Sequence, residues 1–157
     1  MNEVIHAADA WSNNWAWGLP LIASTVLAHG VGLVLVQMHI VLRLSREFGH
    51  RRSVVAFAFV AAASALLLTI LLGVEAGAWA AAYVALGARP DFASAMLYSL
   101  SAMTSYGHAN VYLAERWQLM GALEALNGMM LFGMTTAFLV SMLQSNWPEQ
   151  LREGPRR

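Results

Sequence analysis

Three apolar stretches, each about 20 residues or longer, take up most of this chain and limit what it can fold into. They run from about Leu19 to Leu44, from about Ser53 to Tyr83, and from about Trp117 to Leu143. A helix rises 1.5 Å per residue, so about 20 residues cross the roughly 30 Å hydrocarbon core of a bilayer. Only 11% of the residues are charged, against about 25% in an ordinary soluble domain. The sequence predicts an all-α membrane protein with three transmembrane helices.

Arginine positions predict the orientation of these helices. All nine basic residues are arginine; four lie between residues 43 and 52 and three in the tail after residue 150. Only Arg89 and Arg116 fall on the other side. Because basic loops stay cytoplasmic, the N-terminus is expected outside and the C-terminus inside. The arginine-only, alanine-rich composition indicates a bacterial inner membrane.

A shorter helix is predicted between the second and third apolar stretches. Gly87 and Pro90 end the second stretch, and Asp91 is placed to cap a helix over Phe92–Met103. This helix is too short to cross a bilayer, which predicts a re-entrant hairpin. Small and polar residues follow at 104–110, and irregular backbone at membrane depth must line water.

This order of elements resembles the pore module of potassium channels. More specifically, the chain resembles small bacterial ion channels of the two-helix pore family, whose pore stretch reads S-L-x-x-x-T-T-L-G-Y-G-D. Residues Ser99 to Asn110 align with that pattern without a gap. Downstream, W-Q-L-M-G at 117–121 and E-A-L-N-G at 124–128 resemble the family's W-R-L-L-G and E-A-x-N-G. The resemblance covers roughly residues 73–143.

The resemblance implies a homotetramer in which four filter loops meet on one axis. Their backbone carbonyls would replace the hydration shell of a permeant monovalent cation, K⁺ or Na⁺. The implied selectivity filter comprises Thr104, Ser105, Tyr106, Gly107, His108, Ala109 and Asn110. The expected function is therefore that of a pore-forming cation channel subunit in a lipid bilayer. No enzymatic activity, cofactor, metal site or nucleic acid partner is expected.

Three filter residues depart from the family pattern. Ala109 replaces the second filter glycine, and a residue with a Cβ in the left-handed conformation costs roughly 1–2 kcal/mol. His108 replaces the family tyrosine, and Asn110 replaces the aspartate at the pore mouth, which reduces the attraction for cations. These changes predict relaxed potassium selectivity. His108 has two open interpretations, a neutral bracing residue or a ring that becomes positive at acidic pH and blocks entry.

Residues near the filter are predicted to support it. Glu124 lies about two turns inside the membrane from Trp117, where a carboxylate usually has a partner or a role. It is expected to hydrogen-bond the short helix at Ser101 or Thr104; an influence on ions in the pore is the alternative. Tyr98 is grouped with Glu124 and Ser101 as filter support.

The third apolar stretch is predicted to line the pore. Gly128 lies where the lining helix of such channels often bends, although a small residue also permits close helix packing. Asn127, Leu131 and Thr135 lie around it at helical spacing and are predicted to face the cavity.

Two other function classes remain open. His29 and His39 would be the ligands of a membrane-embedded haem or metal enzyme, but ten residues apart they do not share one helix face. A helix–helix hydrogen bond is the preferred interpretation for each. The second class is a non-conducting interaction or transporter subunit with the same fold, which Ala109 and Asn110 keep open.

The predicted organisation has four parts. These are an interfacial N-terminal segment (1–18), the first transmembrane helix with its basic cytoplasmic loop (19–52), a pore module of outer helix, pore helix, filter and lining helix (53–144), and a cytoplasmic tail (145–157).

Overall fold

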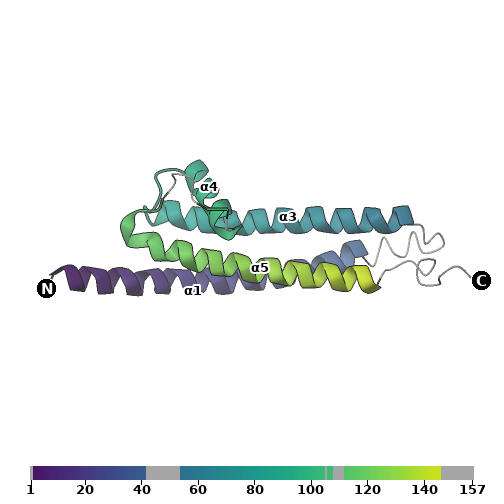
Figure 1. Cartoon of the computed structure of the whole chain (residues 1–157), viewed down its shortest axis with the longest axis horizontal. Helices are drawn as coiled ribbons and strands as arrows, with labels where there is room; N and C mark the ends of the chain where they lie inside the picture. Colours follow the sequence, from purple (N-terminus) through teal and green to yellow (C-terminus); the bar gives the residue numbers. More distant parts are fainter. Residues whose placement is uncertain (1, 42–53, 105, 108–111, 146–157) are drawn as a thin grey trace, which may run out of the picture. The chain divides into compact units, whose positions relative to one another are not determined.

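Helices make up nearly all of the structure. The computed structural model describes residues 2–41, 54–104, 106–107 and 112–145, and these residues form no strand (Figure 1). The elements in chain order are α1 (Asn2–Val36), the π-helix η1 (Gln37–Val41), α3 (Val54–Ala85), α4 (Phe92–Met103), the 3₁₀-helix η2 (Glu115–Trp117) and α5 (Gln118–Ser145).

Three of these helical regions are long and apolar enough to cross a membrane. They cover Trp11–His39, Phe57–Ala85 and Glu115–Ser145, with 29, 29 and 31 residues. At 1.5 Å per residue each exceeds the roughly 30 Å thickness of a hydrocarbon core. The predicted number of apolar spans and their approximate positions are therefore confirmed.

The segment expected at the membrane interface is helical and continuous with the first span. α1 begins at Asn2 and continues through residue 18 into the first apolar stretch, with Pro20 inside the helix. A proline removes one backbone donor, and membrane helices tolerate it where neighbouring groups compensate. Residues 2–18 and the first span are thus largely one helix.

The short helix α4 has the predicted bounds and the predicted cap. Asp91 Oδ1 accepts a hydrogen bond from the Ser94 amide at 2.9 Å, and Asp91 Oδ2 accepts one from the Ser94 hydroxyl at 2.7 Å. Before it, α3 ends at Ala85 and the chain turns at Gly87, whose φ of 65° suits glycine. The predictions for Phe92–Met103, Asp91 and the stop at Gly87 are confirmed.

The Asp91 cap gives the first testable prediction. Its hydrogen bonds with the Ser94 amide and hydroxyl hold the pKa of Asp91 below the ordinary value. A lowered pKa means that the carboxylate's stabilisation is complete above the ordinary pKa and is lost as pH falls through the lowered one. We expect Asp91→Ala to speed hydrogen exchange in the first turn of α4 at neutral pH.

Asp91→Asn is the matched control for that measurement, since asparagine also accepts the cap hydrogen bond but does not titrate. It should keep the exchange protection and lose the pH dependence. If the first turn of α4 were protected from exchange equally well in Asp91→Ala and in wild type, the Asp91 cap would not stabilise α4.

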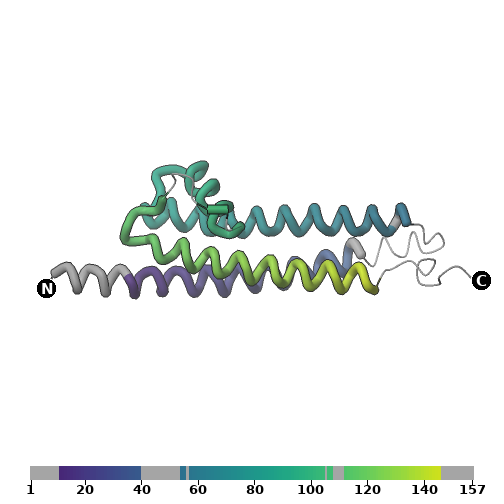
Figure 2. Tube along the Cα trace, in the orientation of Figure 1, coloured from purple at the N-terminus to yellow at the C-terminus, as the bar shows by residue number. Residues whose placement is uncertain are grey.

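Two compact units divide the chain, and each has its own core. The first contains residues 1–28 and 72–132. Within it, the chain passes from α3 through α4 and back to the start of α5 (Figure 2). Its main cluster of buried side chains comprises Trp79, Ala80, Tyr83, Ala88, Ala95, Tyr98, Ala102, Leu113, Trp117, Met120 and Leu123.

The second unit contains residues 29–71 and 133–157. Val60 and Met142 are buried together, so α3 and α5 pack against each other there. On α1, a Cβ added to Gly32 would lie 2.4 Å from the Leu71 side chain, which shows how closely α1 and α3 approach.

Candidate functional site

The buried side of α4 forms a stripe at helical spacing. Its members are Ala95, Tyr98, Ser99, Ala102 and Met103. Intervals of three and four residues place them on one face of the helix. This face is covered by α3 and α5, so α4 lies against both long helices of the first unit.

A buried hydrogen-bonded cluster around Glu124 joins these three helices. The Glu124 side chain is fully buried, and its Oε2 accepts a hydrogen bond from the Tyr83 hydroxyl of α3 at 2.6 Å. The Ser99 hydroxyl of α4 contacts Glu124 Oε1 and also donates to the Ala76 carbonyl of α3 at 2.7 Å. A buried acid requires such partners, because an unpaired one would cost several kcal/mol.

The number of hydroxyl hydrogens in this cluster indicates whether Glu124 is protonated, because Ser99 contacts both the Ala76 carbonyl and Glu124. A serine hydroxyl has one hydrogen, and the Ala76 carbonyl can only accept. Glu124 as a neutral carboxylic acid can supply the hydrogen for the Ser99 contact while its other oxygen accepts from Tyr83. We therefore take Glu124 as a structural group that fastens α4 between α3 and α5.

The predicted partner of Glu124 needs a correction. The Ser101 hydroxyl donates to the Leu97 carbonyl and the Thr104 hydroxyl to the Leu100 carbonyl, both within their own turn of α4. Glu124 instead meets Ser99, because Ser99 lies on the buried face and Ser101 and Thr104 do not. The spacing of the apolar α4 residues carried that information, which the sequence prediction did not use.

Two glycines of α5 allow α4 to approach it closely. A Cβ at Gly121 would lie 2.0 Å from the Tyr98 hydroxyl, and a Cβ at Gly128 would lie 2.4 Å from the Met103 carbonyl oxygen. Tyr98 also packs edge-on against Tyr83 with 5.5 Å between ring centroids. At Gly128 the structure therefore supports the packing interpretation, and α5 continues as a helix through this residue.

These contacts fix how far α4 extends along its neighbours. Gly128 is ten residues after Gln118, and Ala76 is nine residues before Ala85. At 1.5 Å per residue the C-terminal half of α4 meets α3 and α5 about 14–15 Å from their ends, which is about half of a bilayer core.

The described residues after α4, 106–107 and 112–114, have no regular secondary structure. Thr104 closes the helix, the Tyr106 amide donates to the Ser101 carbonyl at 3.1 Å, and Gly107 has φ of 92°. Further on, the Ala114 amide donates to the Ala88 carbonyl at 3.1 Å, beside the end of α3.

Part of the predicted filter is described. Tyr106 is 83% exposed within the single chain, and Gly107 has a positive φ, a conformation that glycine adopts readily. Ser105, His108, Ala109 and Asn110 lie outside the described residues, as do the arginines at 43–52 and the tail after residue 145.

The predicted cavity-lining residues are covered by the chain itself. The Asn127 amide nitrogen donates to the Thr25 hydroxyl at 2.8 Å, and Leu131 is fully buried beside Ala76 and Met103. In the second unit, the Thr135 hydroxyl lies 2.9 Å from His29 Nε2. Their assignment to the cavity is corrected, since this stripe of α5 packs inward. The polar residues of this stripe did not reveal whether it faces protein or a cavity, because either position suits a polar side chain in a membrane helix.

The two histidines of the first span behave differently. His29 is buried and pairs with Thr135, which confirms the predicted hydrogen bond between helices. His39 Nδ1 instead lies 3.2 Å from the Leu35 carbonyl of the preceding turn. Among the described residues, no group of three His, Cys, Asp or Glu side chains is placed to hold a metal ion.

Asn14 is a structural residue that the sequence prediction missed. Its amide nitrogen donates to the Arg116 carbonyl at 2.7 Å, and its Oδ1 accepts from the Met120 amide at 2.9 Å. It thus satisfies a backbone donor in the first turn of α5 that has no helical partner. Together with Thr25, it shows that α1 is hydrogen-bonded to α5 in the first unit. Asn14 follows two other polar residues, Ser12 and Asn13, so no signal in the sequence distinguished it.

The comparisons with known proteins add no relative. No family model matches the chain, and no curated protein or solved structure matches it significantly.

Proposed function

We propose that the chain is the pore-forming subunit of a homotetrameric cation channel in which α4 and residues 104–110 form a re-entrant pore loop. The observation that carries the proposal is the position of α4. This helix is fastened between two membrane-length helices, and its C-terminal half meets them about 14–15 Å from their ends. Residues 106–107 and 112–114 are irregular backbone, and the Ala114 amide donates to the Ala88 carbonyl beside the end of α3.

The chemistry of this arrangement suits a cation. The C-terminal end of α4 directs the negative end of its helix dipole to the middle of the membrane. The filter backbone that follows would supply carbonyl ligands, and irregular backbone is stable at that depth only where it lines water or protein. Four copies are needed because one loop provides only one side of a pore.

The face of α5 that would line the pore is different from the one predicted. The side chains of the inward stripe are buried within the single chain; the stripe consists of Glu124, Asn127, Leu131 and Thr135. The opposite face is exposed in the single chain and includes Leu126, Met129, Met130 and Val140. We assign the pore lining and part of the subunit contacts to this apolar face.

The N-terminus would lie outside the cell and the C-terminus in the cytoplasm, in a bacterial inner membrane. In that orientation the loop carrying Arg89 and Arg116 faces outward, and the filter opens to the same side.

Ion flux from purified protein in liposomes tests the proposal. We expect potassium and sodium to pass, with little discrimination, and a large organic cation to be retained. Gly107→Ala should reduce flux, since a Cβ at φ of 92° costs about 1–2 kcal/mol in each of four chains. Gly77→Ala is the control, because a Cβ there meets nothing within 4 Å.

Acidic pH on the outer side separates the two interpretations of His108. A positive ring would block cation entry, and a bracing residue would leave flux unchanged. A tetrameric protein that passes no cation at any pH would contradict the channel proposal. The non-conducting interaction subunit would then be the better description, as Ala109 and Asn110 in the filter sequence suggest.

A further inference from the structure

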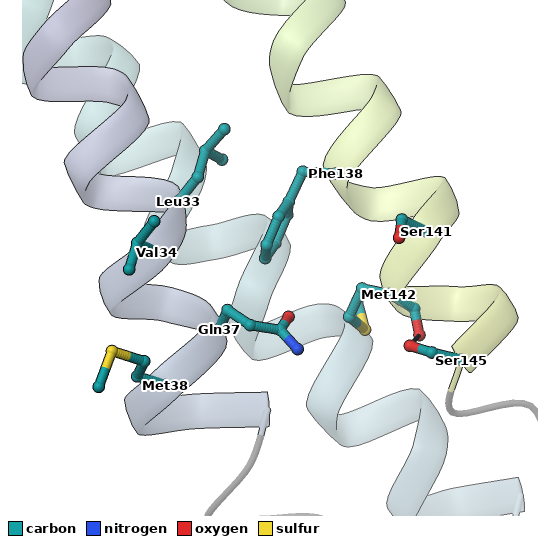
Figure 3. A pocket seen from close by; sticks show the side chains of 8 residues that line it. All are labelled: Leu33, Val34, Gln37, Met38, Phe138, Ser141, Met142 and Ser145. Atoms are coloured by element: carbon teal, nitrogen blue, oxygen red, sulfur yellow. Dashed lines mark hydrogen bonds between the residues drawn. The ribbon is translucent and has the colours of Figure 1, made fainter.

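A cavity of about 300 Å³ lies in the second unit, between the end of α1 with η1 and the last turns of α5. Pockets that hold small ligands measure about 300–1,000 Å³, so this volume is enough for a compact group or part of a chain. Leu33, Val34, Gln37, Phe138, Ser141 and Ser145 are among its lining residues (Figure 3).

The lining changes character along the helix axis. Leu33, Val34 and Phe138 form the end that lies deeper in the two helices. Gln37 begins η1, and Ser145 is the last residue of α5, so the polar end of the cavity is at the helix ends. These two segments are the termini of candidate membrane spans. The cavity is therefore apolar toward the hydrocarbon, and toward the interface its polar side chains lie beside Met38 and Met142.

Two polar side chains at the cavity are available to a ligand. The Gln37 amide points from η1 toward α5 (Figure 3). Within the part of the chain that the structure describes, neither this amide nor the Ser141 hydroxyl makes a side-chain hydrogen bond to protein. Gln37 is half-buried, and its two N–H donors favour a ligand with oxygen acceptors.

Gln37 also lies in an unusual backbone. Residues Gln37–Val41 form a π-helix, and such turns occur frequently at functional sites because they widen a helix and redirect its side chains. Val34 and Met38, which border the cavity, are 57% and 54% exposed. An opening edged by apolar side chains admits a molecule from the bilayer more readily than one from water.

We propose that this cavity binds one membrane phospholipid. Its ester and glycerol oxygens would accept hydrogen bonds from Gln37 and Ser141, and part of one acyl chain would lie against Leu33, Val34 and Phe138. A bilayer lipid has the same sequence of polar and apolar parts along the membrane normal as this cavity. The site lies in the second unit, so it stands whether or not the chain conducts ions.

Photo-crosslinking in vesicles tests the lipid site. Full-length protein is reconstituted in phosphatidylethanolamine and phosphatidylglycerol containing a trace of phosphatidylethanolamine with a diazirine near its ester. We expect adducts to concentrate on residues 33–38 and 138–145 compared with the exposed apolar residues Val55, Phe59 and Leu66 of α3. Gln37→Leu should lower the adduct yield about two- to tenfold, the effect of losing one or two hydrogen bonds.

Gln144→Leu is the matched control, since it makes the same change on the exposed side of α5 and does not line the cavity. It should leave the yield at the wild-type level. Ser141→Leu provides a second test by filling the cavity, and size-exclusion chromatography with circular dichroism verifies folding. Adducts spread evenly over the exposed apolar residues, or equal yields in the Gln37 and Gln144 variants, would overturn the proposal.

Discussion

Replacing Gly128 with alanine is expected to displace the C-terminal end of α4 and to remove most cation flux. The added Cβ would lie 2.4, 2.7 and 2.9 Å from the O, Cα and C atoms of Met103. These are backbone atoms, so no side-chain rotation relieves the overlap. Overpacking of this kind costs about 1–3 kcal/mol, and the helix propensity of alanine returns at most about 1 kcal/mol.

The effect on flux should exceed the effect on folding. Met103 is the last residue of α4, directly before the proposed filter, so a shift there moves all four filter loops together. We expect flux to fall about tenfold or more, since 1.4 kcal/mol already corresponds to a factor of ten. Liposome flux and thermal unfolding in detergent measure the two effects separately.

Gly77→Ala is again the control for this substitution. Gly77 is also helical and belongs to the same unit, but a Cβ there meets nothing within 4 Å. It should be as stable as wild type or slightly more stable. A Gly128→Ala protein with wild-type stability and flux would show that α4 does not press against α5 as described.

The sequence predicted those features of the fold that local signals determine. Asp91 as a cap, Gly87 as a stop and the length of Phe92–Met103 rest on interactions within a few residues, and all three were correct. The three apolar spans were likewise predicted by length and composition alone.

The choice of helix faces could not be predicted in the same way. Asn127, Leu131 and Thr135 pack inward because Thr25, Ala76 and His29, far away in the sequence, are their neighbours. The polar residues Glu124, Asn127 and Thr135 share one face of α5, but in a membrane helix such a face can point either to protein partners or to a pore, so the pattern does not decide between them. The apolar spacing in α4 could have shown that Ser99 lies on the buried face of that helix. Which residue Ser99 meets there, Glu124, depends on tertiary contacts that the sequence pattern does not contain.

Glu124→Leu is expected to loosen the contact between α3, α4 and α5. It leaves the buried Tyr83 hydroxyl without its acceptor, at a cost of about 1–3 kcal/mol in each chain. Glu124→Gln should cost less. An amide can accept from Tyr83 through its oxygen and donate to Ser99 through its nitrogen, as a neutral carboxylic acid does.

Glu115 supplies the control pair, because its side chain is exposed. Glu115→Leu and Glu115→Gln make the same two changes as the Glu124 variants without altering a buried side chain. Thermal unfolding of the four variants, with a double-mutant cycle between Tyr83→Phe and Glu124→Leu, measures the coupling. A coupling near zero would mean that the cluster does not fasten the helices. If glutamine destabilised as much as leucine, Glu124 would have to be a carboxylate, and the second hydrogen at Ser99 would need another source. Rescue by glutamine would instead support a neutral acid at Glu124, which stabilises α4 without placing negative charges beside the proposed ion pathway.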